Sequence, residues 1–184
     1  MSLDYLSDSH FLSTLEKLSL EKYKNENVRK EKTISSILKN KFIGSYYLNK
    51  YGKPLSDDKF FNISHSHGYI ALVIDEVPVG IDIEKIREAD DDLRNYISND
   101  DEKKYIHDDA SFFEIWTNKE ALVKANGNGI SQKPNSIPAL PFNSIRTYDN
   151  KTFFNKTTRY QDLIITVSRQ CEKDFDISII EEVI

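Results

Sequence analysis

The chain has 184 residues, of which 39% are hydrophobic and 30% are charged, and it contains ten Tyr and ten Phe. Such a supply of large apolar side chains can build a core, which excludes a disordered protein, and no repeat period indicates a solenoid. The net charge of −5 is uneven, since residues 1–53 carry +4, residues 54–110 carry −9 and residues 111–184 are neutral. We therefore expect no nucleic-acid partner, although a local cationic site is compatible with this distribution.

Cysteine content and hydropathy indicate the compartment. The single cysteine, Cys171, cannot form an internal disulfide, which excludes the disulfide-stabilised secreted scaffolds. Residues 1–4 lack the charged and apolar regions of a signal peptide, and the longest apolar run, residues 70–74, is far shorter than the roughly 20 residues of a membrane helix. We expect a cytoplasmic protein that does not contact a membrane.

Apolar residues recur at helical intervals in two segments of the N-terminal third. They predict helices over residues 9–23 and 28–48, the second with Ile34 and Ile37 on its apolar face. The sequence Tyr51-Gly52-Lys53-Pro54 is expected to end the second helix, because Gly permits a left-handed cap and Pro cannot continue the hydrogen-bond ladder.

The pattern then changes to that of short strands. Residues 60–64, 69–75 and 79–84 are rich in aromatic and β-branched side chains, and we expect the last two segments to form a hairpin. Residues 88–109 carry many acidic side chains with short helical patterns at 93–97 and 103–106, which favours a solvated surface connector.

The strongest helix signal in the chain covers residues 111–125. Ser111 is the expected N-cap, Glu114 lies in the first turn, and a Gly-Asn-Gly sequence from Gly127 should stop the helix. Alternating segments that predict strands follow at 145–148, 152–154, 162–168 and 174–180. Helices and strands without regular βαβ alternation predict an α+β fold.

Two carboxylates share one face of the strand predicted at 79–84. The side-chain period of two places Ile81 and Ile83 on one face and Asp82 and Glu84 on the other, with the two acidic Cα atoms about 7 Å apart. A hard divalent cation such as Mg²⁺ or Mn²⁺ would neutralise both carboxylates. A plain exposed strand face with a basic residue nearby is the alternative.

A stripe on the helix predicted at 111–125 offers further groups. Trp116, Glu120 and Lys124 are spaced i, i+4, i+8 and so lie along one line of the helix surface. Taken alone, this stripe favours a core tryptophan and a surface ion pair. A third carboxylate that met Asp82 and Glu84 would instead complete the protein ligands of a Mg²⁺ site, with a lysine beside a phosphate.

Two histidines, His65 and His67, follow the end of the strand predicted at 60–64. Strand-end loops carry a disproportionate share of binding groups, although a single histidine is more often structural. With no cysteine nearby and no third histidine before His107, a zinc site is not expected.

Four short motifs occur one after another along the chain. They are Tyr51-Gly52-Lys53-Pro54, Phe61-Asn62-Ile63-Ser64-His65-Ser66, Val79-Gly80-Ile81-Asp82-Ile83-Glu84-Lys85 and Phe112-x-x-x-Trp116-x-x-Lys119-Glu120-Ala121-x-x-Lys124. Together they resemble the motif series of the 4′-phosphopantetheinyl transferases of the Sfp type, strongly over residues 51–130 and weakly in the flanks. One departure is His67, where small residues are commoner in that family.

The resemblance implies an activity and a metal. The activity is transfer of the phosphopantetheine arm of coenzyme A to a serine of an apo acyl or peptidyl carrier protein, with release of adenosine 3′,5′-bisphosphate. Asp82, Glu84 and Glu120 would hold Mg²⁺, or Mn²⁺, against the pyrophosphate. Glu120 or a water on the metal would take the serine proton, and Lys124 would stabilise the departing phosphate.

The resemblance also implies contacts with coenzyme A. His65 would bind the 3′-phosphate, and Lys119 would lie near the phosphates. The full expected set is Lys32, Lys53, Pro54, Ser64, His65, Lys119 and Lys124, with Lys22 as a further basic residue.

The family fold is a pseudodimer of two similar α/β lobes. We therefore expect an N-terminal lobe at 1–86 and a C-terminal lobe at 87–184, with the active site at their seam, in a monomeric protein. Carrier proteins are generally acidic, so docking is expected to avoid residues 88–109 or to use apolar contacts there.

Two other functions stay open on sequence grounds. A non-catalytic module that binds coenzyme A or a carrier protein is disfavoured, because all three carboxylates and Lys124 are present. A Mg²⁺-dependent nuclease is also disfavoured, because Lys85 directly follows Glu84 and so points to the opposite face of the strand.

Overall fold

The computed structural model describes residues 7–129 and 133–181. Its elements in chain order are η1 (Ser7–Phe11), α1 (Thr14–Leu20), α2 (Glu26–Phe42), β1 (Tyr47–Leu48), β2 (Pro54–Leu55), β3 (Phe60–Ser66), β4 (Tyr69–Asp75), β5 (Val79–Lys85), α3 (Asp91–Ile97), α4 (Asp100–Tyr105), α5 (Asp109–Asn126), η2 (Pro134–Ser136), β6 (Ser144–Tyr148), β7 (Lys151–Tyr160) and β8 (Leu163–Arg169). The predicted α+β class is confirmed. Within these ranges no helix is both long and apolar enough to cross a bilayer.

The strands are divided between separate sheets. β3 and β4 form a hairpin, β1 and β2 form a small pair, and the C-terminal strands form an antiparallel sheet in the order β5-β8-β7-β6. The predicted pairing of residues 69–75 with 79–84 is therefore wrong. His67 and Gly68 have φ values of 47° and 86°, which makes a tight turn that folds β4 back onto β3, while β5 pairs with β8.

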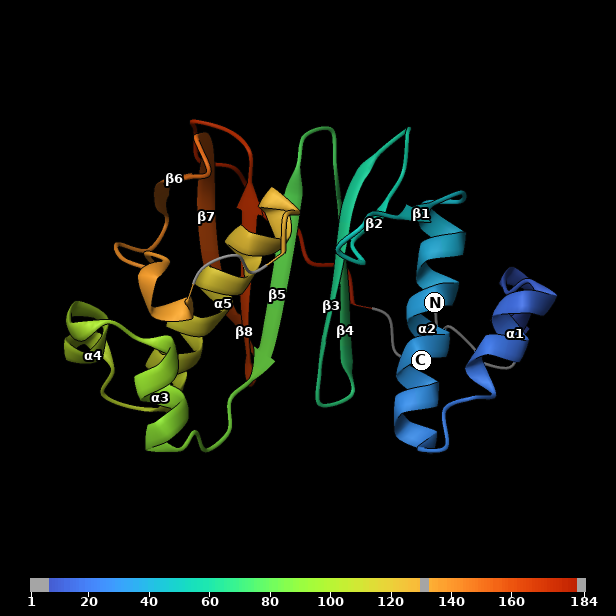
Figure 1. The fold of residues 1–184 in the computed structure, drawn as a ribbon, viewed down its shortest axis with the longest axis horizontal. Helices are drawn as coiled ribbons and strands as arrows, with labels where there is room; N and C mark the ends of the chain where they lie inside the picture. Colours follow the sequence, from blue (N-terminus) through green and yellow to red (C-terminus); the bar gives the residue numbers. More distant parts are fainter. Residues whose placement is uncertain (1–6, 130–132, 182–184) are drawn as a thin grey trace.

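β3 and β5 run side by side in the centre of the molecule although they belong to different sheets (Figure 1). Three side chains of β3 replace the missing backbone pairing. Asn62 Oδ1, Ser64 Oγ and Ser66 Oγ accept hydrogen bonds from backbone N–H groups of β5, those of Ile81, Ile83 and Lys85, at 3.0, 3.3 and 3.2 Å. We call these three residues the polar ladder. It joins the two sheets in parallel register.

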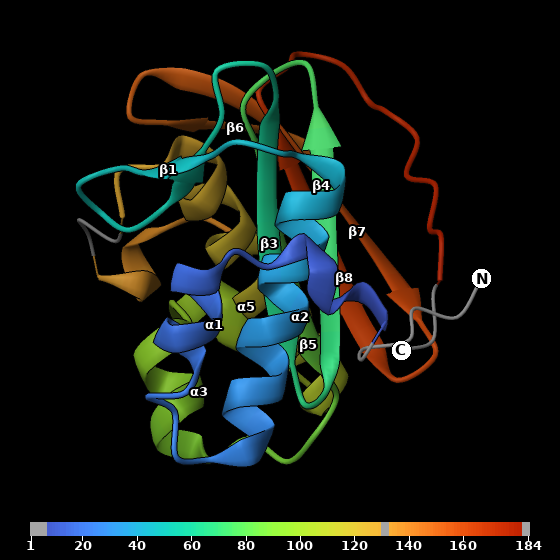
Figure 2. The same cartoon turned by 90° about the vertical axis from the view of Figure 1, so that its right-hand side faces the viewer.

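A long helix packs on each side of this seam. α2 lies against the outer face of the β3–β4 hairpin with α1 beside it (Figure 2), and α5 lies across β5, β8 and β7. The contact between α5 and β5 is close because β5 contains Gly80: a Cβ at this position would overlap the backbone of Ala121 and Ala125. Gly80 therefore sets the distance between the strand and the helix that carry the predicted acidic residues.

The two faces of β5 separate as the sequence predicts. Ile81 and Ile83 are buried in a cluster with Leu163, Ile165 and Val167 of β8. Gly80 and Asp82, which alternate with these isoleucines, contact α5 instead. This arrangement directs the carboxylate face of β5 into the contact between strand and helix.

Several predicted boundaries need correction. The second helix ends at Phe42 and not at 48, because Gly44, at φ 83°, donates its N–H to Lys39 O and closes the helix. The N-cap of α5 is Asp108, whose side chain accepts from the Ser111 backbone, so Ser111 is the third helical residue. Gly127, at φ 79°, ends α5 as predicted.

Residues 174–180 do not form the predicted strand. Phe175 and Ile177 of this segment pack on the apolar face of β5 and β8, and Lys156 Nζ donates to Phe175 O at 2.6 Å. The segment thus covers a face of the sheet, where its backbone cannot join the strand ladder. Its alternating apolar residues are explained by this one-sided burial.

The break between the sheets falls between β4 and β5, near residue 77. β5 belongs with β8 in the C-terminal sheet, so a lobe boundary at 86 would cut this strand from its own sheet. The acidic connector is also more ordered than expected, since it forms α3 and α4, each with a side-chain N-cap.

The close approach at Gly80 gives a first prediction. Gly80→Ala should destabilise the protein by about 3 kcal/mol, because the added methyl meets helix backbone that cannot move aside like a flexible side chain. Gly52→Ala is the control. An alanine at the φ of 81° of this position should lower the free energy of unfolding by only about 1–2 kcal/mol, since nothing lies near the new methyl. Urea denaturation of both variants measures this difference, and equal losses would contradict the proposed role of Gly80.

Candidate active site at the seam between the two sheets

The acidic and basic groups singled out in the sequence meet where α5 crosses β3 and β5. The contributing side chains from these three elements are Ser64, Ser66, Asp82, Glu84, Glu120 and Lys124. β5 supplies two carboxylates at alternate positions, and α5 supplies a carboxylate and an ammonium one turn apart. Ser64 of β3 bonds both Asp82 and Lys124, and Ser66 bonds Glu84.

Asp82 is the most deeply buried of these carboxylates, with 4% of the residue exposed. Its Oδ1 accepts from Lys124 Nζ at 2.5 Å and from Ser64 Oγ at 3.0 Å. Its Oδ2 is buried without a hydrogen-bond partner among the described residues. Burial raises the pKa of Asp82 to about 7, against the opposing charge of Lys124 and with further support from the charges of Glu120 and Glu84.

Glu84 has a parallel arrangement one step along β5. Its Oε2 accepts from Ser66 Oγ at 2.6 Å and from Arg87 Nη1 at 2.7 Å. As at Asp82, a hydroxyl of the polar ladder and a cation share one carboxylate oxygen. The second oxygen, Oε1, accepts no hydrogen bond from the described residues.

Glu120 lies near both carboxylates of β5 without a hydrogen-bond donor of its own among the described residues. Burial raises the pKa of Glu120, the charge of Lys124 opposes this shift, and the charge of Glu84 adds to it. A carboxylate whose pKa is raised holds a proton more tightly than an ordinary glutamate and is the stronger base.

The donor set fits a hard divalent cation. Three carboxylates stand against Lys124 and Arg87, so the cluster lacks positive charge, and Asp82 Oδ2 is a buried oxygen without a partner. No three acidic, histidine or cysteine side chains of the described ranges are close enough to hold a metal as they stand. Lys124 bridges to Asp82 in this arrangement and provides part of the missing charge. Carboxylate oxygens are the ligands that Mg²⁺ and Mn²⁺ prefer.

Lys53 stands at the edge of this cluster and binds the C-terminal end of α5. Its Nζ donates to Lys124 O at 2.5 Å, and Ala125 O and Val79 O lie at 3.4 and 3.5 Å. Burial, with the charge of Lys151, lowers the pKa of Lys53 to about 8. A cation at the end of a helix is favourable because the last carbonyls carry partial negative charge. Lys53 thereby fixes the segment after β1 against α5.

Lys119 is buried and bonded inside the protein. The residue is 2% exposed, and its Nζ donates to Glu102 Oε2 at 2.6 Å, Ile97 O at 2.7 Å and Pro134 O at 3.1 Å. All three donors of the ammonium are used inside the protein. Lys119 thereby ties α5 to α3, α4 and η2, and its expected place near the phosphates stays a prediction.

The other predicted coenzyme A residues lie outside the carboxylate cluster. His65 precedes Ser66 on β3 but faces the opposite way, with Nδ1 4.0 Å from Glu31 of α2. Lys32 lies on α2 near Lys39, Pro54 pairs with Leu48, and Lys22 is exposed after α1. No contact of these residues with the acidic cluster is present in the described part of the chain.

Sequence reasoning missed two residues that bond Glu84, Ser66 and Arg87, and two that support the fold around the site, Asn62 and Glu102. Ser66, Asn62, Arg87 and Glu102 were not singled out as functional. The alternation of Asn62, Ser64 and Ser66 on one face of β3 was visible in the sequence, but their partner strand was not. Glu102 was hidden within an acidic run, where charge usually indicates a solvent-exposed surface.

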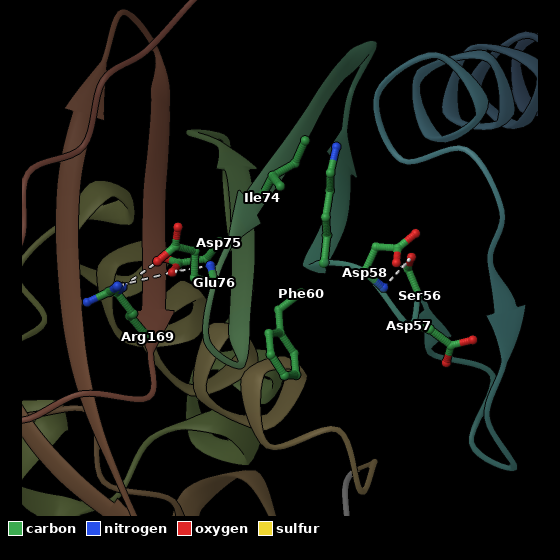
Figure 3. A pocket seen from close by; sticks show the side chains of 9 residues that line it. Ser56, Asp57, Asp58, Phe60, Ile74, Asp75, Glu76 and Arg169 are labelled. Atoms are coloured by element: carbon green, nitrogen blue, oxygen red, sulfur yellow. Dashed lines mark hydrogen bonds and ion pairs between the residues drawn. The ribbon is translucent and has the colours of Figure 1, made fainter.

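A hollow of the described surface lies away from this cluster (Figure 3). It measures about 690 Å³ and is found at the start of β3 and the end of β4, the opposite end of this hairpin from Ser66. Its lining includes Asp57, Asp58, Asp75 and Glu76, and Arg169 is engaged in two bonds to Asp75 at 2.7 and 3.1 Å. This acidic hollow shares no residue with the carboxylate cluster and is unsuited to an anion.

Comparison with known proteins shows the family of the chain. The model of the 4′-phosphopantetheinyl transferase superfamily matches residues 78–179, more than half of the chain. The chain belongs to this superfamily. The matched range contains β5 and α5, and therefore Asp82, Glu84, Glu120 and Lys124. The predicted resemblance is thus confirmed.

Three curated relatives carry the same family name. The chain is 39% identical over 111 residues to the 4′-phosphopantetheinyl transferase gsp of Aneurinibacillus migulanus, covering 56% of this chain and 44% of that protein. It is 36% identical over 89 residues to psf-1 of Bacillus pumilus, covering 43% and 36%. It is 32% identical over 91 residues to Sfp of Bacillus subtilis strain 168, covering 45% and 41%. These matches span less than half the length of each relative.

The buried position of Lys119 generates a second prediction. Lys119→Met should lower the free energy of unfolding by about 3–5 kcal/mol, because it leaves Glu102 buried without its cation. Lys104→Ala on α4, which breaks the exposed pair with Asp101, should leave the urea midpoint nearly unchanged. A stable Lys119→Met variant that bound coenzyme A poorly would restore the phosphate role and contradict this assignment.

The pKa of Asp82 yields a third prediction, on pH and metal. Its folded pKa of about 7 exceeds the ordinary 3.8, so the stability it contributes is present below about pH 4 and is lost as the pH rises through 7. A cation replaces that proton, and MgCl₂ should raise the melting temperature more at pH 8 than at pH 5. Thermal denaturation with and without MgCl₂ measures this, and Asp82→Asn should remove the difference. An equal rise at both pH values for the unaltered protein would count against the site.

Proposed function

We propose that this protein transfers the 4′-phosphopantetheine group of coenzyme A to a serine of an apo acyl or peptidyl carrier protein, in a Mg²⁺-dependent reaction. Adenosine 3′,5′-bisphosphate is the other product. The observation that carries the proposal is the Asp82–Lys124 contact beside Glu84 and Glu120, a set of acidic and basic groups within one buried seam. Membership of the superfamily supports the same reaction.

The charge of the cluster accounts for the need for a cation. Asp82, Glu84 and Glu120 together carry more negative charge than Lys124 and Arg87 can balance, and a pyrophosphate would add to the excess. Mg²⁺, or Mn²⁺ in its place, would be held by the three carboxylates and would draw charge from the reacting phosphate. The buried, unpartnered Oδ2 of Asp82 supports a ligand role for this side chain.

Glu120 is the proposed general base. The serine oxygen of the carrier forms a bond to the phosphorus of the phosphopantetheine phosphate, the bond from this phosphorus to the bridging pyrophosphate oxygen breaks, and the serine proton passes to Glu120. Burial raises the pKa of this carboxyl, which strengthens it as a base. Such proton transfer contributes typically about 10²–10⁴-fold to the rate.

Lys124 is the proposed partner of the leaving phosphate. Its ammonium has three N–H donors, of which two bond Asp82 and Ser64. The third is left for an oxygen of the departing adenosine bisphosphate. Positive charge at this position stabilises the negative charge that develops as the pyrophosphate bond breaks.

Further residues are proposed to contact coenzyme A. His65, Lys53, Pro54 and Ser64 remain proposed contacts, and Lys32 is a proposed cation on α2. Ser64 and Lys53 lie beside the carboxylate cluster, whereas His65 faces α2. For His65 to bind the 3′-phosphate, the nucleotide would have to lie on the α2 side of β3.

We also propose a pseudodimeric arrangement of two lobes. It is supported by two long helices, α2 with 17 residues and α5 with 18, that each pack on a sheet, one on either side of the seam. A division between the two lobes near residue 77 agrees better with the break between the sheets than the expected boundary at 86 does. A monomeric state, a cytoplasmic location and carrier docking away from residues 88–109 stay predictions.

A non-catalytic module for coenzyme A or carrier binding is the alternative. It makes the same binding contacts without transfer. The complete set of three carboxylates and Lys124 in one cluster favours the enzyme.

A fourth prediction tests the transfer directly. The protein is incubated with coenzyme A, MgCl₂ and an apo carrier protein of fatty-acid, peptide or polyketide synthesis, and the carrier is examined by intact mass for one added phosphopantetheine. Asp82→Asn and Glu120→Gln should each lower kcat by at least about 10²-fold, because each removes a proposed metal ligand and Glu120→Gln also removes the base. Lys124→Ala should lower kcat more than the affinity for coenzyme A.

Asp101→Asn serves as the matched control. Asp101 is a fully exposed carboxylate on α4 and should leave kcat unchanged. Coenzyme A binding without transfer to any of the carriers would favour the binding module. Full activity of Asp82→Asn would overturn the metal assignment.

A further inference from the structure

Two carboxylate clamps repeat at a spacing of two residues along the seam. At each one, a serine of β3 accepts a backbone N–H of β5 and donates its own hydroxyl hydrogen to a β5 carboxylate. Ser64 accepts from Ile83 and donates to Asp82. Two residues along, Ser66 accepts from Lys85 and donates to Glu84.

A cation completes each clamp on the oxygen that the serine already holds. Lys124 joins Ser64 on Oδ1 of Asp82, and Arg87 joins Ser66 on Oε2 of Glu84. One oxygen of each carboxylate is therefore fixed by two donors. Oδ2 of Asp82 and Oε1 of Glu84 accept no hydrogen bond from the described residues and are the oxygens left for a ligand.

We propose that Ser66 is a positioning residue, which holds Glu84 by Oε2 and so presents Oε1 to a divalent cation, as Ser64 does for Asp82. The role follows from the geometry of the hydroxyl group. Its oxygen accepts the strand N–H while its hydrogen points to the carboxylate, which links the rotamer of Glu84 to the register of the two strands. Outer hydrogen bonds of this kind orient metal-binding carboxylates. The inference rests on the proposed function for its cation.

Asn62 provides an internal comparison. It is the third member of the polar ladder and bonds Ile81 N at 3.0 Å, but the adjoining β5 residue is Gly80, which has no side chain to hold. Asn62 and Ser66 are similarly buried, at 5% and 6% exposure. Removing either one breaks a bond across the seam, and only removal of Ser66 releases a carboxylate.

The test measures Mn²⁺ affinity by electron paramagnetic resonance of MnCl₂, with and without coenzyme A. Ser66→Ala should weaken Mn²⁺ binding about tenfold or more, as is typical when an outer partner of a metal ligand is lost. Asn62→Ala should keep Mn²⁺ affinity within about twofold, although its melting temperature falls. Ser66→Thr, which retains a hydroxyl, should restore most of the affinity.

Equal Mn²⁺ affinities of Ser66→Ala and Asn62→Ala would overturn the proposal and leave Ser66 a purely structural residue. Absence of Mn²⁺ binding to the unaltered protein under both conditions would overturn it as well. The affinity comparison uses no carrier protein, so its failure is distinct from a failure of transfer. A protein that transfers phosphopantetheine can fail this test, and one that does not transfer can pass it.

Discussion

The structure depends on a seam at which side chains take the place of backbone pairing. β3 and β5 run in parallel in two different sheets, and Asn62, Ser64 and Ser66 of β3 accept the backbone N–H groups of β5 across this seam. A hydroxyl that accepts a strand N–H keeps its own hydrogen free for another acceptor. For this reason the bonds that join the sheets also hold the carboxylates, and the site forms where the two halves meet.

Burial gives this seam its chemistry. Asp82 is held in a water-poor contact between β3, β5 and α5, which raises its pKa and that of Glu120. The close approach of α5 to β5 at Gly80 makes this burial possible. On the other side of α5, the buried Lys119–Glu102 pair attaches the helix to α3 and α4. The acidic segment thus supplies part of the support for the site.

Local sequence patterns predicted much of this site. The features that depend on which strands pair could not be predicted in this way. The period of two placed Asp82 and Glu84 on one face of β5, and the helical period placed Glu120 beside Lys124. Those rules do not state which strands pair, so the β3–β4 hairpin and the role of Ser66 were missed. Residues 174–180 were predicted as a strand because one-sided apolar alternation also suits a segment lying on a sheet. Helical spacing gives no burial, so the buried position of Lys119 was not predicted either.

The central claim is that Asp82, Glu84 and Glu120 bind one divalent cation that also contacts coenzyme A. A crystal structure of the protein with coenzyme A and MnCl₂, using the anomalous signal of manganese, tests it most directly. The account predicts a single manganese peak at bonding distance from all three carboxylates and from the pyrophosphate, with Ser64 and Ser66 still on the oxygens they hold here. Coenzyme A bound away from this seam, or a manganese peak without these carboxylates, would contradict it.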